Sequence, residues 1–221
     1  MKRPVYKARR HRPPSRHAER SARERILEAA HDRFYRDGIR ATGIDRVIEE
    51  AGVTKVTFYR HFPSKNELVL AFLEFRHNNW MRWFVAELQR HRTVTQSPIM
   101  AIPATFAEWF YSGHYRGCAF INAVVEVGNT VPGTAEIARR HKREMTAAIA
   151  ALLPPSRNSK TLAEAAALAI DGAIVRAQIE GTHAPALKML RWSLKALSTA
   201  HPPAELRHGI RRRSHTRRAA P

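Results

Sequence analysis

The stretch AGVTKVTFYRHFPSK, which ends at Lys65, concentrates side chains that can bind a polyanion. Lys55 and Lys65 carry positive charge, His61 adds an imidazole, and Tyr59 adds a phenol group. Ammonium, hydroxyl and phenol groups contact nucleic-acid phosphates, while methyl groups and donors read base edges in the major groove. The same side chains could also coat a solvated helix. The interpretation therefore depends on the elements that hold them.

Two short helices are predicted to hold this stretch, over residues 44–51 and 54–62, with Gly52 and Val53 between them. A preceding helix runs from about Ser21 to Asp37, and this layout is typical of a helix-turn-helix. The inward side chains are predicted to be Ile44, Val47, Ile48, Ala51, Val53, Phe58 and Phe62. The outer and flanking surface of the second helix is left to Lys55, Val56, Thr57, Tyr59, Arg60 and His61. An amphipathic hairpin with a merely solvated polar face is the alternative.

The rest of the chain also has helical periodicity, and an all-α fold is predicted. Three capping boxes mark helix starts, at Ser21 with Glu24, Ser64 with Glu67, and Thr161 with Glu164. Beyond the helix-turn-helix, helices are predicted over residues 64–91, 98–111, 120–127, 132–152, 161–180 and 185–199.

Positive charge is concentrated at the two ends of the chain. Lys and Arg number 38 against 19 acidic residues in 221, a net charge of +19. Residues 1–25 contribute +8 (ten bases, two acids) and residues 201–221 contribute +5 (six bases, one acid). Residues 1–19 and 201–221 are accordingly predicted to be a disordered basic arm and tail, suited to nucleic acid or an anionic surface or simply solvated. One cysteine, no apolar run long enough to cross a membrane and no secretory signal favour the cytoplasm.

The run GIRATGIDRVIEEAGVTKVTFYRHFPSKNEL, residues 38–68, resembles the DNA-binding module of TetR/AcrR-type transcriptional regulators. Its segment TKVTFYRHFPSK is the most specific part, and RGCAFINAVVEV and DGAIVRAQIEG resemble the ligand-binding and dimerisation region of one branch. The resemblance covers about residues 20–200. It implies a small N-terminal module over 20–80, with the helix-turn-helix at 43–62, and a larger ligand-binding and dimerisation domain over 81–200.

The resemblance implies that residues 54–62 form a recognition helix in the major groove of a palindromic operator. The implied DNA-binding residues are Thr42, Lys55, Val56, Thr57, Tyr59, Arg60, His61 and Lys65. The sequence departs from the family at Asp45, where several relatives have a basic base-reading residue. This carboxylate could accept a hydrogen bond from cytosine or cap its own helix, and we expect capping.

The resemblance also implies a ligand-responsive homodimer, with repression as the default. An apolar or aromatic effector is expected to contact aromatic walls and one polar anchor, namely Trp80, Trp83, Phe84, Phe106, Trp109, Phe110, Phe120 and Asn122. Two apolar stripes on the last helices are predicted to pack across a two-fold axis: Leu162, Ala166, Ala169, Ala173 and Ala177, and Leu187, Leu190, Leu194 and Leu197. Alternatively, both stripes face the core of the monomer.

Two other functions fit parts of the sequence. A helical enzyme could use Cys118 as a nucleophile, but no catalytic, phosphate-binding or metal-binding motif is present, and a lone cysteine beginning an apolar helix favours the core. His31, His77 and His141 are predicted to lie singly on the surface. A nonspecific basic nucleic-acid-binding protein fits the charge but needs no recognition helix. The sequence therefore favours a non-enzymatic regulator that needs neither cofactor nor metal.

Overall fold

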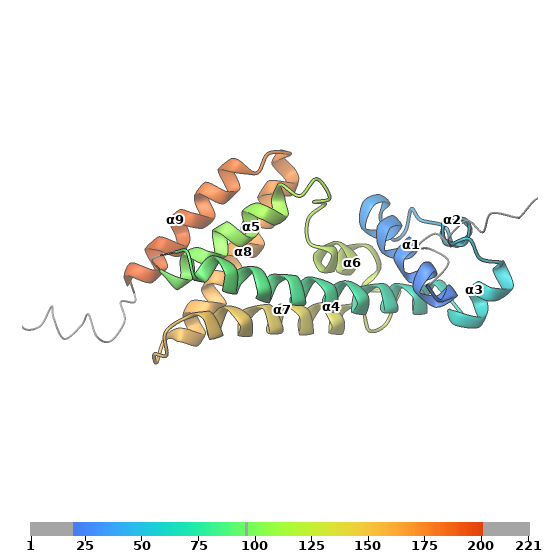
Figure 1. Cartoon of the computed structure of the whole chain (residues 1–221), viewed down its shortest axis with the longest axis horizontal. Helices are drawn as coiled ribbons and strands as arrows, with labels where there is room; N and C mark the ends of the chain where they lie inside the picture. Colours follow the sequence, from blue (N-terminus) through green and yellow to red (C-terminus); the bar gives the residue numbers. More distant parts are fainter. Residues whose placement is uncertain (1–19, 96, 201–221) are drawn as a thin grey trace, which may run out of the picture.

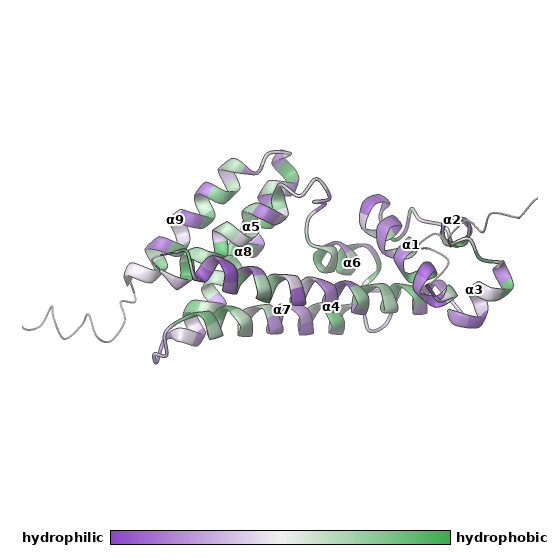
Figure 2. Cartoon of the chain, viewed as in Figure 1, coloured by the Kyte–Doolittle hydropathy of each residue, from purple (hydrophilic) through white to green (hydrophobic). Residues whose placement is uncertain are grey.

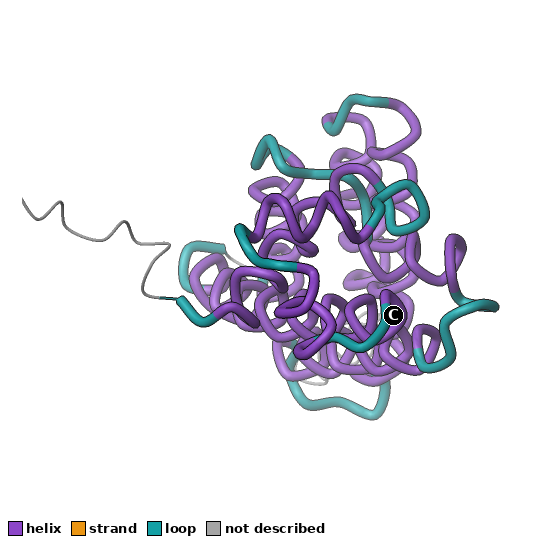
Figure 3. Tube along the Cα trace, turned by 90° about the vertical axis from the view of Figure 1, so that its right-hand side faces the viewer, coloured by secondary structure: helices purple, strands orange, loops and turns teal. Residues whose placement is uncertain are grey.

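The computed structural model describes residues 20–95 and 97–200, and within them every regular element is a helix (Figures 1 and 3). The all-α prediction is confirmed. The elements in chain order are α1 (Ala22–Asp37), α2 (Ile44–Ala51), α3 (Lys55–His61), α4 (Lys65–Arg92), the 3₁₀ turn η1 (Pro98–Met100), α5 (Ala101–Phe110), α6 (Ala119–Val127), α7 (Thr134–Leu152), α8 (Ser159–Glu180) and α9 (Ala184–Ala200). The predicted basic arm and tail lie outside the described residues.

Hydroxyl caps define where several helices begin. The Ser21 hydroxyl accepts the Glu24 amide at 3.2 Å and the Glu24 carboxylate accepts the Ser21 amide at 2.8 Å, so this capping box is confirmed. The Ser64 hydroxyl likewise accepts the amide of Glu67. The third prediction was wrong, because α8 begins at Ser159 and Thr161 already lies inside it. A capping box is only four residues long, and a similar pattern arises by chance inside a helix.

Helices α1, α2 and α3 pack together at one end of the molecule, beside the beginning of α4 (Figure 1). Ile26, Val47 and Phe58 are fully buried there, one from each helix. Of the predicted inward residues, Val47, Ala51, Phe58 and Phe62 are buried, and Ile44, Ile48 and Val53 are partly buried against the core. The turn between α2 and α3 depends on Gly52, whose φ of +60° is left-handed and unfavourable for residues with a Cβ atom.

The other end of the molecule is built on α4, which runs beside α7, while α8 packs against both α7 and α9 (Figure 1). Hydrophilic colours dominate α1 in Figure 2, whereas hydrophobic colours dominate α5 and α6. Phe84, Phe106, Phe110 and Phe120 are buried between these helices. Since α4 belongs to both ends, the division into a module over 20–80 and a domain over 81–200 stays a prediction.

The predicted dimer stripes on α8 and α9 face the core of the chain itself. Leu190, Leu194 and Ala166 are buried, and Leu162, Ala169 and Leu197 are partly buried against the same core. Ala173, Ala177 and Leu187 are also buried. The buried members of both stripes are therefore covered within the chain, which does not favour an intermolecular interface there, and for the partly exposed Leu162, Ala169 and Leu197 that interface stays a prediction. Periodicity identifies an apolar stripe, but these stripes are already used where α8 packs against α7 and α9 and where α9 packs against α5 and η1.

A different set of apolar side chains is exposed on these two helices. Leu168 is 76% and Trp192 67% exposed, and Val175, Ile179 and Met189 are exposed as well. Among the described residues, no helix combines the length and the apolar character needed to cross a membrane.

Candidate nucleic-acid interface and ligand cleft

Helix α3 presents to solvent most of the side chains predicted to contact nucleic acid. Lys55, Val56, Tyr59 and Arg60 are exposed, with Val56 at 80%. Thr57 and His61 are half-buried. The Thr54 hydroxyl caps the helix by accepting the Thr57 amide at 3.2 Å. The buried Phe58 anchors α3 to α1 and α2, so the opposite surface stays free for a partner.

Asp45 does not cap its helix. Gly43 is the N-cap residue of α2, and no side chain makes a capping hydrogen bond there. The Asp45 carboxylate instead lies 3.5 Å from the ammonium group of Lys55, on the surface. The expectation of capping was wrong because α2 begins one residue before Asp45. A carboxylate in the first turn still interacts favourably with the helix dipole.

Thr42 is buried rather than presented to a partner. The residue is 1% exposed, and its hydroxyl donates a hydrogen bond to the carbonyl of Gly38 at 2.7 Å. A direct contact between this side chain and nucleic acid is not compatible with that burial, so the prediction is corrected. Lys65 donates from Nζ to the carbonyl of Thr42 at 2.7 Å, and burial lowers the pKa of Lys65 while Glu126 opposes that shift. Lys65 and Thr42 together connect the start of α4 to the loop before α2.

A cleft of about 700 Å³ lies between α1 on one side and α4, α5 and the loop after α5 on the other. Its lining includes Trp80, Trp83 and Trp109, three of the residues predicted for a ligand pocket. The other five predicted residues do not line this cleft. Phe84, Phe106 and Phe110 are buried behind the tryptophans of the lining, and Phe120 stacks on His141 with ring centroids 3.7 Å apart. Asn122 is also absent from the lining and donates from its amide to the carbonyl of Arg116 at 3.1 Å.

Residues that the sequence interpretation did not assign to a pocket, all but Gly113 with polar side chains, form the rest of the lining. They are His31, Asp32, Tyr35, Arg36, Arg76, Asn79, Glu108, Ser112, Gly113, His114 and Arg116. Arg76 is the one with a recognisable signal, because it stands four residues after Phe72 and four before Trp80 on the inward face of α4. A charged residue in register with buried aromatic residues is usually paired or functional.

The cleft lies where α1 is hydrogen-bonded to the second half of the molecule. The Tyr35 hydroxyl donates to the carbonyl of Gly117 at 2.9 Å and accepts the amide of Arg116 at 3.0 Å. Nearby, the amide of Arg40 donates to the carboxylate of Glu126 at 3.0 Å. These bonds join the helix-turn-helix end directly to the loop before α6 and to α6 itself.

Two histidines predicted for the surface are buried. Nδ1 of His77 lies 3.2 Å from Nδ1 of His141, and Nε2 of His77 lies 3.2 Å from the carboxylate of Glu144. Burial, followed by the charge of Lys142, lowers the pKa of His141 to about 2. A neutral His141 can donate to His77, which in turn donates to Glu144. Isolated histidines gave no sequence signal of this pairing, because the partners come from different helices.

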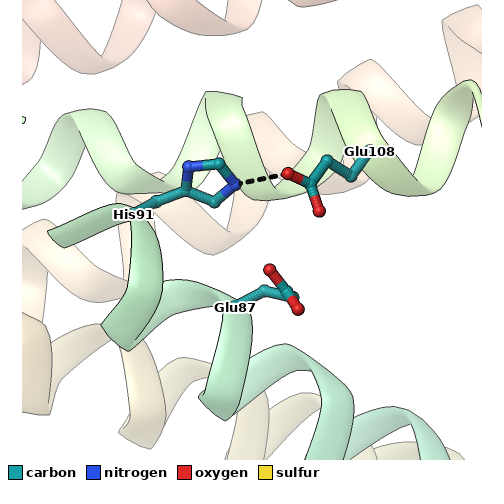
Figure 4. Close-up of side chains that lie close together, drawn as sticks. All are labelled: Glu87, His91 and Glu108. Atoms are coloured by element: carbon teal, nitrogen blue, oxygen red, sulfur yellow. Dashed lines mark hydrogen bonds and ion pairs between the residues drawn. The ribbon is translucent and has the colours of Figure 1, made fainter. Parts of the chain in front are cut away.

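Glu87, His91 and Glu108 form a cluster of possible metal ligands near the end of α4 (Figure 4). One ligand atom from each residue lies within 4.8 Å of the others. The Arg90 guanidinium forms ion pairs with both carboxylates, and Nε2 of His91 lies 3.0 Å from the Glu108 carboxylate. This ion-pair network offsets part of the charge of the two acids and connects α4 to α5.

Residues 26–72 match the family described as "Bacterial regulatory proteins, tetR family". A curated relative, an uncharacterized HTH-type transcriptional regulator in the lacX 3' region of Lactococcus lactis subsp. lactis, is 28% identical over 113 residues. That match covers 49% of this chain and 56% of the relative. The HTH-type transcriptional regulator TtgR of Pseudomonas putida is 44% identical over 55 residues, 25% of this chain and 26% of the relative. The chain thus matches about half or less of the length of these curated relatives.

Solved structures match over a larger part of the chain. A TetR-family transcriptional regulator from Streptomyces coelicolor is 27% identical with a TM-score of 0.67, covering 80% of this chain and 96% of that one. A putative TetR-type transcriptional regulator from Streptomyces avermitilis is 26% identical with a TM-score of 0.66, covering 82% and 98%. The similarity therefore includes both the helix-turn-helix end and the larger helical part.

Proposed function

From the TetR-family module of residues 26–72, and from the TetR-family fold that continues through the helices after it, we infer that this protein is a DNA-binding transcriptional regulator. The observation that carries the inference is the exposed surface of α3. Val56 points away from the buried Phe58, and Lys55 and Tyr59 are exposed beside it, as a helix that enters the major groove requires. Lys55 and Arg60 supply positive charge, and Val56 supplies a methyl surface that complements thymine.

We propose that two copies of the chain bind one operator. A single seven-residue α3 reads few base pairs, whereas a two-fold dimer reads two half-sites about one helical turn apart. The exposed face of α8 and α9, made by Leu168, Val175, Ile179, Met189 and Trp192, supports this proposal. Apolar side chains gathered on the outer face of two adjacent helices favour packing against the same face of a second copy.

We also propose that a small ligand releases the protein from DNA, and that the protein acts as a repressor. The cleft is lined both by α1, which packs on α2 and α3, and by α4 and α5 of the larger part. A ligand there contacts both ends of the molecule. It can therefore favour one relative arrangement of them over another through differential affinity. The larger part, from about residue 81 to residue 200, is accordingly proposed as the sensing and dimerisation domain.

Selection of bound fragments from a random DNA pool tests the central inference. We expect enrichment of one palindromic sequence with half-sites about one helical turn apart. The affinity for that sequence should exceed the affinity for random DNA by about a thousandfold or more at the same salt concentration. Equal affinity for all sequences would instead favour a nonspecific basic nucleic-acid-binding protein. The curated relatives are regulators, and the geometry offers no reason to prefer an enzyme with Cys118, which is buried.

A further inference from the structure

The cleft between α1 and α4 contains a cation without an acidic partner. Arg76 is partly buried, and its guanidinium carbon lies 4.0 Å from the centroid of the Tyr35 ring. Its Nη1 is 3.2 Å from Nε2 of His31. Within residues 20–95 and 97–200, Arg76 forms no ion pair with a carboxylate. Holding a guanidinium away from water without a counter-charge is unfavourable, so this position is ready for an anion.

The other charged groups of the cleft do not supply that anion. The Asp32 carboxylate bonds to Nδ1 of His31 and is mostly exposed, and the Glu108 carboxylate is held by Arg90 and His91. Arg36 is paired with Asp37 at 3.1 Å.

Arg116 resembles Arg76 in having no carboxylate partner among the described residues. Its Nη1 donates to the carbonyl of Tyr115 at 2.8 Å. Its backbone amide donates to the Tyr35 hydroxyl, while Arg76 stacks on the Tyr35 ring. Arg76 and Arg116, two arginines without acidic partners, therefore both contact Tyr35, the first through its guanidinium and the second through its backbone amide.

Aromatic side chains form the apolar part of the same cleft. The ring centroids of Trp80 and Trp83 lie 6.0 Å apart, and those of Trp80 and Trp109 lie 5.8 Å apart. Tyr35 and Arg76 line the same cleft as these rings. A planar hydrocarbon body complements indole faces, and a carboxylate accepts parallel hydrogen bonds from a guanidinium.

We propose that the effector of this protein is an aromatic carboxylic acid, whose carboxylate binds Arg76 and Arg116 and whose rings pack against Trp80, Trp83 and Trp109. The inference rests on the proposed function, since it names the ligand class of the sensing cleft. An acid bound in this way contacts Tyr35 of α1 and the loop before α6 at once. It therefore acts where the two ends of the molecule are hydrogen-bonded.

The test compares 1-naphthoate with the neutral, nearly isosteric 1-naphthamide, using the full chain. Binding is followed by quenching of tryptophan fluorescence and by titration calorimetry. We expect 1-naphthoate to bind at least about tenfold more tightly than 1-naphthamide, the ratio that one charge-assisted hydrogen bond supplies. Equal affinity of the two compounds, or no binding of 1-naphthoate at millimolar concentration, would overturn the proposal.

Substitutions of the cleft arginines test which of them binds the carboxylate. Arg76→Gln should lose the preference for the acid, while Arg76→Lys should keep part of it. Arg36→Gln is the matched control, because Arg36 lines the cleft but is paired with Asp37. An unchanged preference in Arg76→Gln, or an equal loss in the control, would contradict the assignment. If Arg76→Gln does not fold, Arg116→Gln provides the same comparison.

Operator binding is measured separately with selected DNA. Failure to bind any specific DNA would refute the proposed function and leave the compound preference standing as a property of the cleft. Specific DNA binding without a preference for the acid would refute only the effector class.

Discussion

The ammonium group of Lys65 donates a hydrogen bond to the backbone carbonyl of Thr42 across 2.7 Å. The two residues are 23 positions apart, at the start of α4 and in the loop before α2. The Thr42 hydroxyl in turn donates to the carbonyl of Gly38, which follows α1. One short chain of hydrogen bonds therefore fixes α1, the α2–α3 pair and α4 relative to one another.

Lys65→Met should consequently lower stability as well as DNA binding. Loss of a charge-assisted hydrogen bond at a partly exposed site should reduce the free energy of unfolding by about 1 kcal/mol. DNA affinity should fall about equally for all sequences. Urea unfolding and salt-dependent DNA titrations measure both effects. Arg139→Met, on the surface of α7, is the control, and unchanged stability of Lys65→Met would contradict the structural role.

Lys55→Ala and Tyr59→Ala should weaken operator binding without unfolding the protein. Both side chains are exposed on α3, and loss of a specific contact should cost about 1 to 3 kcal/mol of binding free energy. Operator affinity and thermal melting are measured for each variant. Wild-type affinity in both variants, with melting also unchanged, would remove α3 from the proposed interface.

Gly52→Ala should destabilise the turn between α2 and α3. A φ of +60° at this position costs a residue with a Cβ atom about 1 to 2 kcal/mol, although no neighbouring atom obstructs the added methyl group. Gly52→Asn is the matched control, because asparagine adopts the left-handed conformation more readily. Denaturant unfolding should rank wild type above Asn and Asn above Ala. An alanine variant as stable as wild type would be inconsistent with the turn described.

Acidification should destabilise the folded chain through His141. The pKa of this imidazole is lowered to about 2 in the folded state, whereas its ordinary value, which applies in the unfolded chain, is 6.5. Below pH 6.5 the unfolded chain therefore binds a proton that the folded chain does not. This difference lowers the free energy of unfolding by about 1.4 kcal/mol per pH unit, or about 2 kcal/mol at pH 5.

His141→Leu should lose most of that pH dependence, whereas His114→Gln, an exposed control, should keep it. Urea unfolding at pH 8 and at pH 5 provides the comparison. Equal slopes for wild type and His141→Leu would show that the imidazole takes up its proton without unfolding.

Leu168→Asp combined with Trp192→Asp should yield folded monomers. Both side chains are exposed on the outer face of α8 and α9, so the substitutions leave the core intact while placing charge in the proposed interface. Sedimentation gives the mass, and helical content is checked by circular dichroism. Val94→Asp with Tyr111→Asp, two exposed apolar residues elsewhere, is the matched control. A wild-type chain that sediments as a monomer with and without operator would contradict the dimer.

The sequence predicted the helices well because local signals define them. Ser21 and Ser64 cap α1 and α4, Gly52 ends α2, and the apolar period placed Val47 and Phe58 inward. The partner of each apolar face was not predictable in the same way. Leu190 and Leu194 are buried in their own chain, because a stripe on one helix does not reveal which neighbour covers it.

For the site as well, the local features were predictable and the long-range contacts were not. Exposure of Lys55 and Tyr59 follows from the local helix-turn-helix pattern. The cleft depends on α1 approaching the loop before α6, and the Tyr35–Gly117 hydrogen bond joins residues 82 positions apart. Contacts at that separation have no local signature, so the polar half of the cleft was missed.

The continuous helix α4 can also convert a small tilt at one end into a larger displacement at the other. Its 28 residues span about 42 Å, with Lys65 at one end, Trp80 near the middle and the Arg90 ion pairs at the other end. A stiff rod of this length that pivots by about 5° at its far end moves Lys65 by about 3.7 Å. That displacement is comparable to one base-pair rise, so a slight tilt in one subunit would put its α3 out of step with the half-site it reads.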